Sequence, residues 1–119
     1  MTSENDDTVV QLLTAYVSVW NERDPQVRRA IGTEVFSPLV RYVDPNISIE
    51  GTSAVDTYVS EWQQQFSEMV FHLGEVRAHH NLAHFYWSFG PPGESPEAHG
   101  WDVAVLENGG ISSVYGFFR

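Results

Sequence analysis

The chain of 119 residues contains no cysteine and no lysine. Without cysteine it forms no disulfide, thiolate nucleophile or cysteine-ligated metal site. Without lysine it cannot form a Schiff base with a carbonyl substrate. It has no apolar run of membrane-spanning length, and its acidic start, MTSENDDT, lacks the basic residues of a signal peptide. These absences predict a cytoplasmic protein.

Positive charge is also scarce, because six arginines face 16 acidic residues and the net charge is -10. Such a charge repels phosphate backbones and anionic bilayers, so we expect neither nucleic-acid nor membrane partners. Phosphate loops, dinucleotide glycine patterns and Gly-x-Ser-x-Gly elbows are absent. The apolar share of 42% is ordinary for a globular chain, and the length predicts a single domain over 1–119.

Helical periodicity dominates the first half of the chain. Apolar residues recur at helical spacing up to Trp20 and predict a first helix that begins at Thr8 and ends before Pro25. Asp24 and Pro25 have the pattern of a helix start, so a second helix is predicted from there to about residue 37. A third helix is predicted from near Ser53.

The second half has the pattern of strands, which are predicted at roughly 69–79, 82–90, 99–107 and 111–118. A shorter strand is predicted at 40–43, between the second and third helices. Helices that precede an antiparallel sheet cover one of its faces. We therefore predict an α+β fold in which a curved sheet wraps around the N-terminal helices and encloses a ligand cavity.

Five segments, taken in order, carry a resemblance along nearly the whole chain: AYVSVWNERD at 15–24, RYVDP at 41–45, FYWSFG at 85–90, GWDVAVLENGGI at 100–111 and VYGFF at 114–118. Together they resemble the nuclear transport factor 2-like superfamily, in the branch of SnoaL-like polyketide cyclases and ketosteroid isomerases. The resemblance implies a cone-shaped half-barrel with an antiparallel or mixed sheet. It also implies a homodimer formed through the outer face of that sheet.

The resemblance further implies three catalytic residues. Tyr16 falls where ketosteroid isomerases place a hydrogen-bonding tyrosine, and Asp44 falls where they place the proton-shuttling carboxylate. Asp102 falls where they place a protonated aspartic acid that shares the oxyanion with the tyrosine. The implied reaction is a cofactor-independent proton transfer next to the carbonyl of a small apolar molecule, giving isomerisation or cyclisation. Steroid is disfavoured as the substrate, because the large side chain of Trp87 is expected inside the cavity.

The residues themselves also indicate a special position for Asp102. Strand alternation places it on one face with Ala104 and Leu106, and burial of that face raises the pKa of its carboxyl. The alternatives stay open: Asp102 pairs with an arginine, Asp44 caps the amides of an Asp-Pro turn, and Tyr16 is a core residue. A non-catalytic ligand-binding or dimerisation module of the same fold is the alternative function.

We expect aromatic residues and one histidine to bind the substrate: Trp20, Tyr58, Phe85, Trp87, Phe89, His80 and Phe118. His80 is placed at the cavity rim, in a hairpin turn where it could approach His79. No second ligand set with metal spacing accompanies these histidines, so no metal and no cofactor are expected. Counting from Gly51, Val59 is the third-helix residue nearest to the acid/base site, with Tyr58 turned to another face. The Arg28-Arg29 pair is expected on a solvated helix face.

Overall fold

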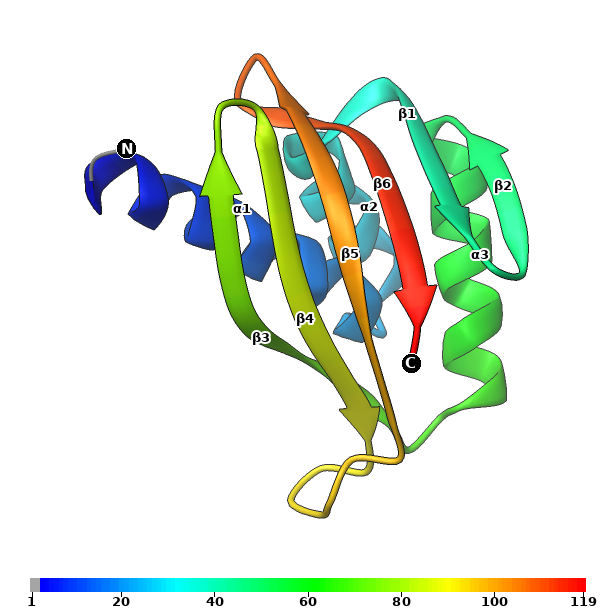
Figure 1. The fold of residues 1–119 in the computed structure, drawn as a ribbon. Helices are drawn as coiled ribbons and strands as arrows, with labels where there is room; N and C mark the ends of the chain where they lie inside the picture. The colour runs from blue at the N-terminus through cyan, green and yellow to red at the C-terminus, as the bar shows by residue number, and fades with distance from the viewer. Residues whose placement is uncertain (1–2) are drawn as a thin grey trace.

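The helices lie together on one side of a curved sheet (Figure 1). The computed structural model describes residues 3–119. Within them the helices are α1 (Ser3–Asn21), α2 (Pro25–Val35) and α3 (Thr52–Gln65). The strands are β1 (Phe36–Asp44), β2 (Ile47–Glu50), β3 (Val70–His79), β4 (Leu82–Gly90), β5 (Ala98–Glu107) and β6 (Gly110–Phe118). The α+β architecture predicted from the sequence is confirmed.

Local chemistry explains how the second and third helices begin. The Asp24 carboxylate accepts hydrogen bonds from the backbone amides of Gln26 and Val27, at 2.9 and 3.4 Å, and Pro25 follows as the first residue of α2. Gly51 precedes α3 with a φ of 97°, a conformation that side-chain-bearing residues rarely adopt. The first helix begins at Ser3, earlier than predicted, because no proline or glycine precedes Thr8 to stop it.

The sheet is mixed and follows the order β2-β1-β6-β5-β4-β3. Strands β3 to β6 form the predicted antiparallel meander, while β1 pairs with β6 in parallel. Two details differ from the prediction: β1 begins at Phe36 rather than at residue 40, and β2 was missed. The alternation Ile-Ser-Ile-Glu over β2 carried the signal, but four residues are too few to distinguish from a loop.

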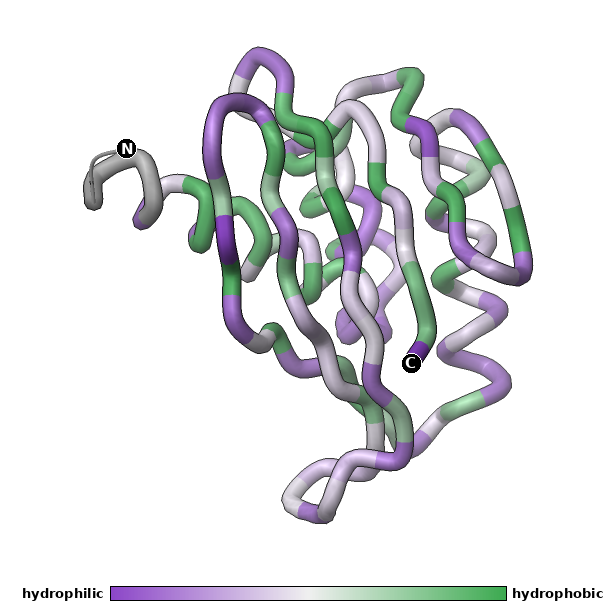
Figure 2. The backbone as a smooth tube through the Cα atoms, viewed as in Figure 1, coloured by the Kyte–Doolittle hydropathy of each residue, from purple (hydrophilic) through white to green (hydrophobic). Residues whose placement is uncertain are grey.

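The core fills the space between the helices and the concave face of the sheet. Leu13, Val59, Phe85, Ile111 and Val114 are at most 1% exposed. In Figure 2 the strands alternate between hydrophobic and hydrophilic segments, and the tight turns between them are hydrophilic. On β4 the buried residues Ala83, Phe85 and Phe89 share the inward face. Phe85 is paired with Asp102 of β5.

The two adjacent arginines of α2 have different surroundings. Arg28 is 3% exposed, and its guanidinium donates to Asp56 Oδ1 at 2.7 Å and to Gln63 Oε1 at 2.9 Å. Arg29 is 63% exposed and reaches Asp56 Oδ2 at 3.2 Å. The predicted solvated position is thus correct for Arg29 and wrong for Arg28, because α3 packs against α2 and covers Arg28.

None of the helices within residues 3–119 combines the length and the apolar composition needed to cross a membrane.

Candidate functional site

Two buried aspartates face the same part of the concave surface. Asp44 ends β1 and is 7% exposed, and Asp102 lies within β5 and is 6% exposed. Strand β6 runs between them and contributes Gly116, the residue paired with Asp102. A Cβ atom on Gly116 would lie 2.9 Å from Asp102 Oδ1 and 3.5 Å from Asp44 Cβ. The two aspartates therefore flank a position that carries no side chain.

Asp44 accepts hydrogen bonds at both carboxylate oxygens. The hydroxyls of Tyr42 and Tyr58 each donate to Oδ2 at 2.8 Å. The backbone amides of Asn46 and Ile47 donate to Oδ1 at 2.8 and 3.2 Å. Burial raises the pKa of Tyr58 to about 12, and its hydrogen bond to Asp44 contributes to the rise, so its hydroxyl stays a proton donor at neutral pH. The turn-capping role foreseen for Asp44 is present, together with two tyrosine donors.

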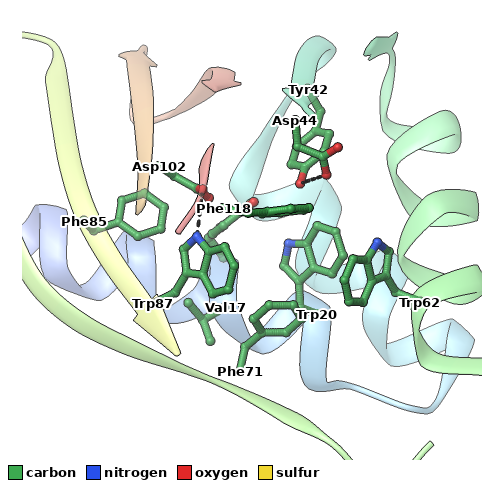
Figure 3. A pocket seen from close by; sticks show the side chains of 11 residues that line it. Val17, Trp20, Tyr42, Asp44, Trp62, Phe71, Phe85, Trp87, Asp102 and Phe118 are labelled. Carbon is green, nitrogen blue, oxygen red and sulfur yellow. Dashed lines mark hydrogen bonds between the residues drawn. The ribbon is translucent and has the colours of Figure 1, made fainter. Parts of the chain in front are cut away.

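Asp102 has a different environment. The indole Nε1–H of Trp87 donates to Asp102 Oδ1 at 3.0 Å, as the dashed line in Figure 3 shows. Burial raises the pKa of the Asp102 carboxyl to about 7, against the lowering effect of the Trp87 hydrogen bond. The negative charge of Asp44 adds to the rise, and hydrogen bonding with Tyr16 opposes it. A large share of Asp102 is therefore protonated near neutral pH.

Tyr16 completes the polar part of the site from α1. Its side chain is 3% exposed and packs edge-on against the rings of Phe36 and Phe85, with centroid distances of 5.9 and 5.8 Å. Burial, followed by the charge of Asp102, raises the pKa of Tyr16 well above its usual value. Tyr16 is thus a neutral hydrogen-bond donor held near Asp102.

A small cavity joins these polar groups and has a volume of about 30 Å³, close to the volume of one water molecule in the liquid. Tyr16, Tyr42, Asp44 and Asp102 contribute its polar lining. Four residues predicted to bind substrate line it as well: Trp20, Phe85, Trp87 and Phe118. Val17, Trp62 and Phe71 complete the wall (Figure 3). Within the described part of the chain, no arginine or histidine lines this cavity.

Three of the predicted substrate-binding residues lie outside the cavity lining: Tyr58, Phe89 and His80. Phe89 packs against the rings of Trp62 and Phe71, behind the wall, at centroid distances of 5.4 and 4.3 Å. His80 lies in the exposed β3–β4 turn with a φ of 54°, and its Nδ1 atom is 3.2 Å from that of His79. His80 is therefore not among the residues that line this cavity. Residues 3–119 contain no group of three or more side chains placed to hold a metal ion.

The hydrogen bonds of two tyrosines to Asp44 were not predicted: Tyr42 was missed, and Tyr58 was expected only to bind substrate. Tyr42 precedes Asp44 by two residues on the same strand, so strand alternation could have placed both on one face. Tyr58 was expected on another face of the third helix, whereas the structure turns its hydroxyl to Asp44. The prediction named Val59 as the third-helix residue nearest to the acid/base site. In the structure Val59 is fully buried in the core.

Comparisons with known proteins agree with this fold. Residues 13–114 match the model of the SnoaL-like domain. A candidate isomerase of the SnoaL-like family from Agrobacterium tumefaciens strain C58 is 30% identical, with a TM-score of 0.89 over 95% of this chain and 98% of that chain. A candidate SnoaL-like polyketide cyclase from Jannaschia sp. CCS1 is 16% identical, with a TM-score of 0.75 over 98% and 86% of the two chains.

A candidate ketosteroid isomerase from Kribbella flavida is 17% identical, with a TM-score of 0.71 over 95% of this chain and 78% of that chain. At this identity, as for the Jannaschia protein, the likeness concerns the fold alone. No curated protein matches the chain.

Proposed function

The chain belongs to the SnoaL-like family of the nuclear transport factor 2-like superfamily, and on that basis we propose that it is an enzyme. The proposed reaction moves a proton next to the carbonyl group of a small apolar molecule, as in an isomerisation or a cyclisation. One observation carries the proposal: Asp44 and Asp102 are both buried beside one apolar cavity, and no arginine or histidine among residues 3–119 lines it. Burial disfavours the ionised form of Asp102, and a carboxyl perturbed in this way is typical of acid/base sites.

In the proposed reaction Asp44 is the base that takes a proton from the carbon next to the carbonyl and returns it to another carbon. The neutral side chains of Tyr16 and Asp102 donate hydrogen bonds to the oxygen that becomes negative. Both tyrosines bound to Asp44 donate to the same oxygen, Oδ2. Proton uptake at that oxygen requires one of these hydroxyls to turn away, so Tyr42 and Tyr58 take part in the proposed step.

The substrate must displace side chains in order to bind. The cavity of about 30 Å³ is an order of magnitude smaller than ordinary ligand pockets. Phe118, on the wall, is 39% exposed, and Trp62 is half-buried, so these two rings can move outward. A compact molecule with one ring and one carbonyl needs the least displacement, and we propose a substrate of that class.

The test uses cyclohex-3-en-1-one, a small ketone that becomes conjugated when a proton moves from carbon 2 to carbon 4. Conjugation raises its ultraviolet absorbance, and the same step in D2O places deuterium on carbon. We expect the protein to accelerate both. Asp44→Asn should lower the rate by about 10²- to 10⁴-fold, the usual contribution of a general base. Asp102→Asn should keep much of the rate, because an amide still donates a hydrogen bond.

Arg77→Ala is the matched control for these variants, because Arg77 is 76% exposed and lies outside the cavity lining. Its rate should equal that of the wild type. Equal rates in the wild-type protein and in buffer, or an undiminished rate in folded Asp44→Asn, would contradict the proposed reaction.

A non-catalytic ligand-binding module is the second candidate function, and the environment of Asp44 favours it. The carboxylate already has two backbone amides and two tyrosine hydroxyls as donors, which is how a structural aspartate is satisfied. This interpretation predicts that cyclohexanone quenches the fluorescence of the cavity tryptophans on binding. It also predicts that the enone is bound without turnover and that Asp44→Asn leaves turnover at the buffer rate.

A homodimer remains part of the proposal. On the outer face of the sheet, Tyr86, Trp101 and Phe117 lie side by side in register across three strands. Tyr86 and Phe117 are 46% and 49% exposed, and the rings of Trp101 and Phe117 stack at 5.9 Å. Exposed apolar surface of this kind favours association. Sedimentation equilibrium at micromolar concentration should give the mass of a dimer, and the mass of a monomer would contradict the proposed dimer.

The cytoplasmic location of the protein stays a prediction.

A further inference from the structure

We propose that Trp87 is a positioning residue for Asp102, whose indole N–H determines which carboxyl oxygen carries the proton when Asp102 is neutral. The assignment concerns the free protein. Its consequence for catalysis rests on the proposed function.

The direction of the hydrogen bond follows from the chemistry of the indole. An indole nitrogen is a donor and has no acceptor capacity. The Trp87 Nε1–H lies 3.0 Å from Asp102 Oδ1, so this oxygen must accept. In a neutral carboxyl the carbonyl oxygen is a better acceptor than the hydroxyl oxygen, so the indole hydrogen bond favours the form that carries its proton on Oδ2. Trp87 thus divides the carboxyl into one oxygen that accepts and one that donates.

The surrounding residues hold the indole in this position. Gly100 of β5 is paired with Trp87 of β4, and a Cβ atom on Gly100 would overlap the Trp87 ring. The rings of Phe71 and Phe118 meet the indole edge-on, with centroid distances of 5.6 and 5.8 Å. Figure 3 shows the indole nitrogen directed at Asp102, with Phe71 on the side away from it. Only a glycine at position 100 allows this placement.

The groups that face Asp102 come from every element packed around it. Helix α1 contributes Tyr16, β1 contributes Tyr42 and the charged Asp44, and β6 contributes Gly116, which has no side chain. No arginine or histidine in the described residues lines this cavity. Hydrogen bonding from Trp87 and Tyr16 is therefore what stabilises the ionised form of Asp102, against burial and the charge of Asp44.

This arrangement has a consequence for the proposed reaction. Asp102 acts there as a neutral donor, so activity falls as the pH rises through the pKa of its carboxyl, about 7. The Trp87 hydrogen bond lowers that pKa and so sets the alkaline limit of activity. Removing the bond should move the limit upward.

The experiment is a carboxyl-carbon NMR titration of Asp102 in the wild type and in Trp87→Phe, which keeps an aromatic ring and loses the donor. We expect the midpoint to rise by about one pH unit, the usual effect of a hydrogen bond to a charged group. Trp101→Phe is the matched control, because Trp101 precedes Asp102 on β5 and points to the opposite face of the sheet. Its midpoint should equal that of the wild type. An unchanged midpoint in folded Trp87→Phe overturns the proposal.

A second measurement needs no variant. In the wild type, the Nε1–H resonance of Trp87, assigned by its through-space contacts to Phe71 and Phe118, should shift with pH at the midpoint of Asp102. A resonance that is insensitive to that transition also overturns the proposal.

The outcomes separate this proposal from the proposed function. If both titrations behave as expected and the enone is not turned over, the positioning by Trp87 stands and the enzyme proposal fails. If the enone is turned over, the alkaline limb of the rate profile should move upward by about one pH unit in Trp87→Phe and stay in place in Trp101→Phe. Turnover with an unmoved limb in Trp87→Phe refutes the positioning alone.

Discussion

Two clusters of buried polar side chains differ in whether a cation lies beside the carboxyl group. Between α2 and α3, the Arg28 guanidinium meets the carboxylate of Asp56 and the amide of Gln63. Partial burial raises the pKa of Asp56, but the hydrogen bonds from Arg28 and Arg29 lower it more, so its pKa lies below the usual value. In the cavity, no arginine or histidine of the described part of the chain compensates Asp102, and burial raises its pKa to about 7. A cation pairs with the carboxylate in the first cluster, whereas two carboxyl groups share the second.

The difference indicates what each cluster is for. A paired and fully hydrogen-bonded arginine stabilises the contact between two helices and has little reason to react. Ionisation of the buried Asp102 carboxyl opposes folding at neutral pH, so the retention of this residue needs another explanation. Proton transfer supplies that explanation under the proposed function. The comparison yields four predictions about stability.

The largest effect is expected from Asp102→Asn. The folded-state pKa of Asp102, about 7, lies above its usual value of 3.8. The stability that its protonation contributes is therefore complete below the usual value and is lost as the pH rises to about 7. Because the amide introduced by this substitution does not titrate, the unfolding free energy of the variant should gain about 4 kcal/mol relative to the wild type between pH 4 and pH 8. Urea unfolding of both proteins at the two pH values measures this change, and a constant difference would contradict it.

Arg28→Ala should break the matched cluster. Removal of the guanidinium leaves Asp56 and Gln63 without their buried partner. We expect the free energy of unfolding to fall by about 3 kcal/mol. This is the lower end of the range for a broken buried ion pair, because solvent reaches the partly exposed Asp56. Urea unfolding at pH 7 measures the loss. A variant as stable as the wild type would show that the Arg28–Asp56 pair adds nothing to the free energy of unfolding, which is the behaviour of many exposed ion pairs.

Tyr58→Phe tests how firmly Asp44 is held. The variant loses the 2.8 Å hydrogen bond to Asp44 Oδ2 and keeps the ring. A loss of about 2 kcal/mol is expected, since the bond goes to a charged group and lies in the interior. Tyr42→Phe provides the comparison, because the Tyr42 hydroxyl donates to the same oxygen at the same distance. If neither variant lost stability in thermal unfolding, Asp44 would not depend on these donors.

The smallest effect is expected from Arg29→Ala. Arg29 contacts the same Asp56 as Arg28, but it is 63% exposed. Its loss should cost at most about 1 kcal/mol, and added salt should reduce the difference further. Urea unfolding with and without added sodium chloride would check this. A loss as large as that of Arg28→Ala would mean that burial does not distinguish the two arginines.

Much of the fold could be predicted because the signals are local. The meander from β3 to β6 follows from alternating residues and turn sequences, and the start of α2 follows from Asp24 and Pro25. The same alternation places Asp102 on one face with Ala104 and Leu106, and the structure shows that this face points inward. The parallel pairing of β1 with β6 could not be found in this way, since it joins segments about seventy residues apart.

The candidate site was predicted only in part. Asp44, Asp102 and Tyr16 meet at one cavity as the family resemblance implied, and Trp20, Phe85, Trp87 and Phe118 line it. The errors concern orientation around a helix and the reach of a turn. The prediction placed the third-helix position nearest to the site one residue too late, at Val59 instead of Tyr58. On a helix, one residue corresponds to a rotation of about 100° around the axis, so Tyr58 was predicted to face away from Asp44. His80 was placed by its position in a turn, whose direction in space no local pattern determines.

By itself, the sequence determined the class of fold, the scarcity of cations and which residues of the meander strands share a face, because these depend on composition and short-range periodicity. Only the tertiary structure decided which polar groups share a partner. In the folded protein, Tyr42 and Tyr58 donate hydrogen bonds to Asp44, and Trp87 donates one to Asp102. Arg28 is buried, whereas Arg29 is exposed to solvent. The physical reason is that burial and hydrogen bonding depend on the packing of distant segments, and these two effects set the pKa of a carboxyl.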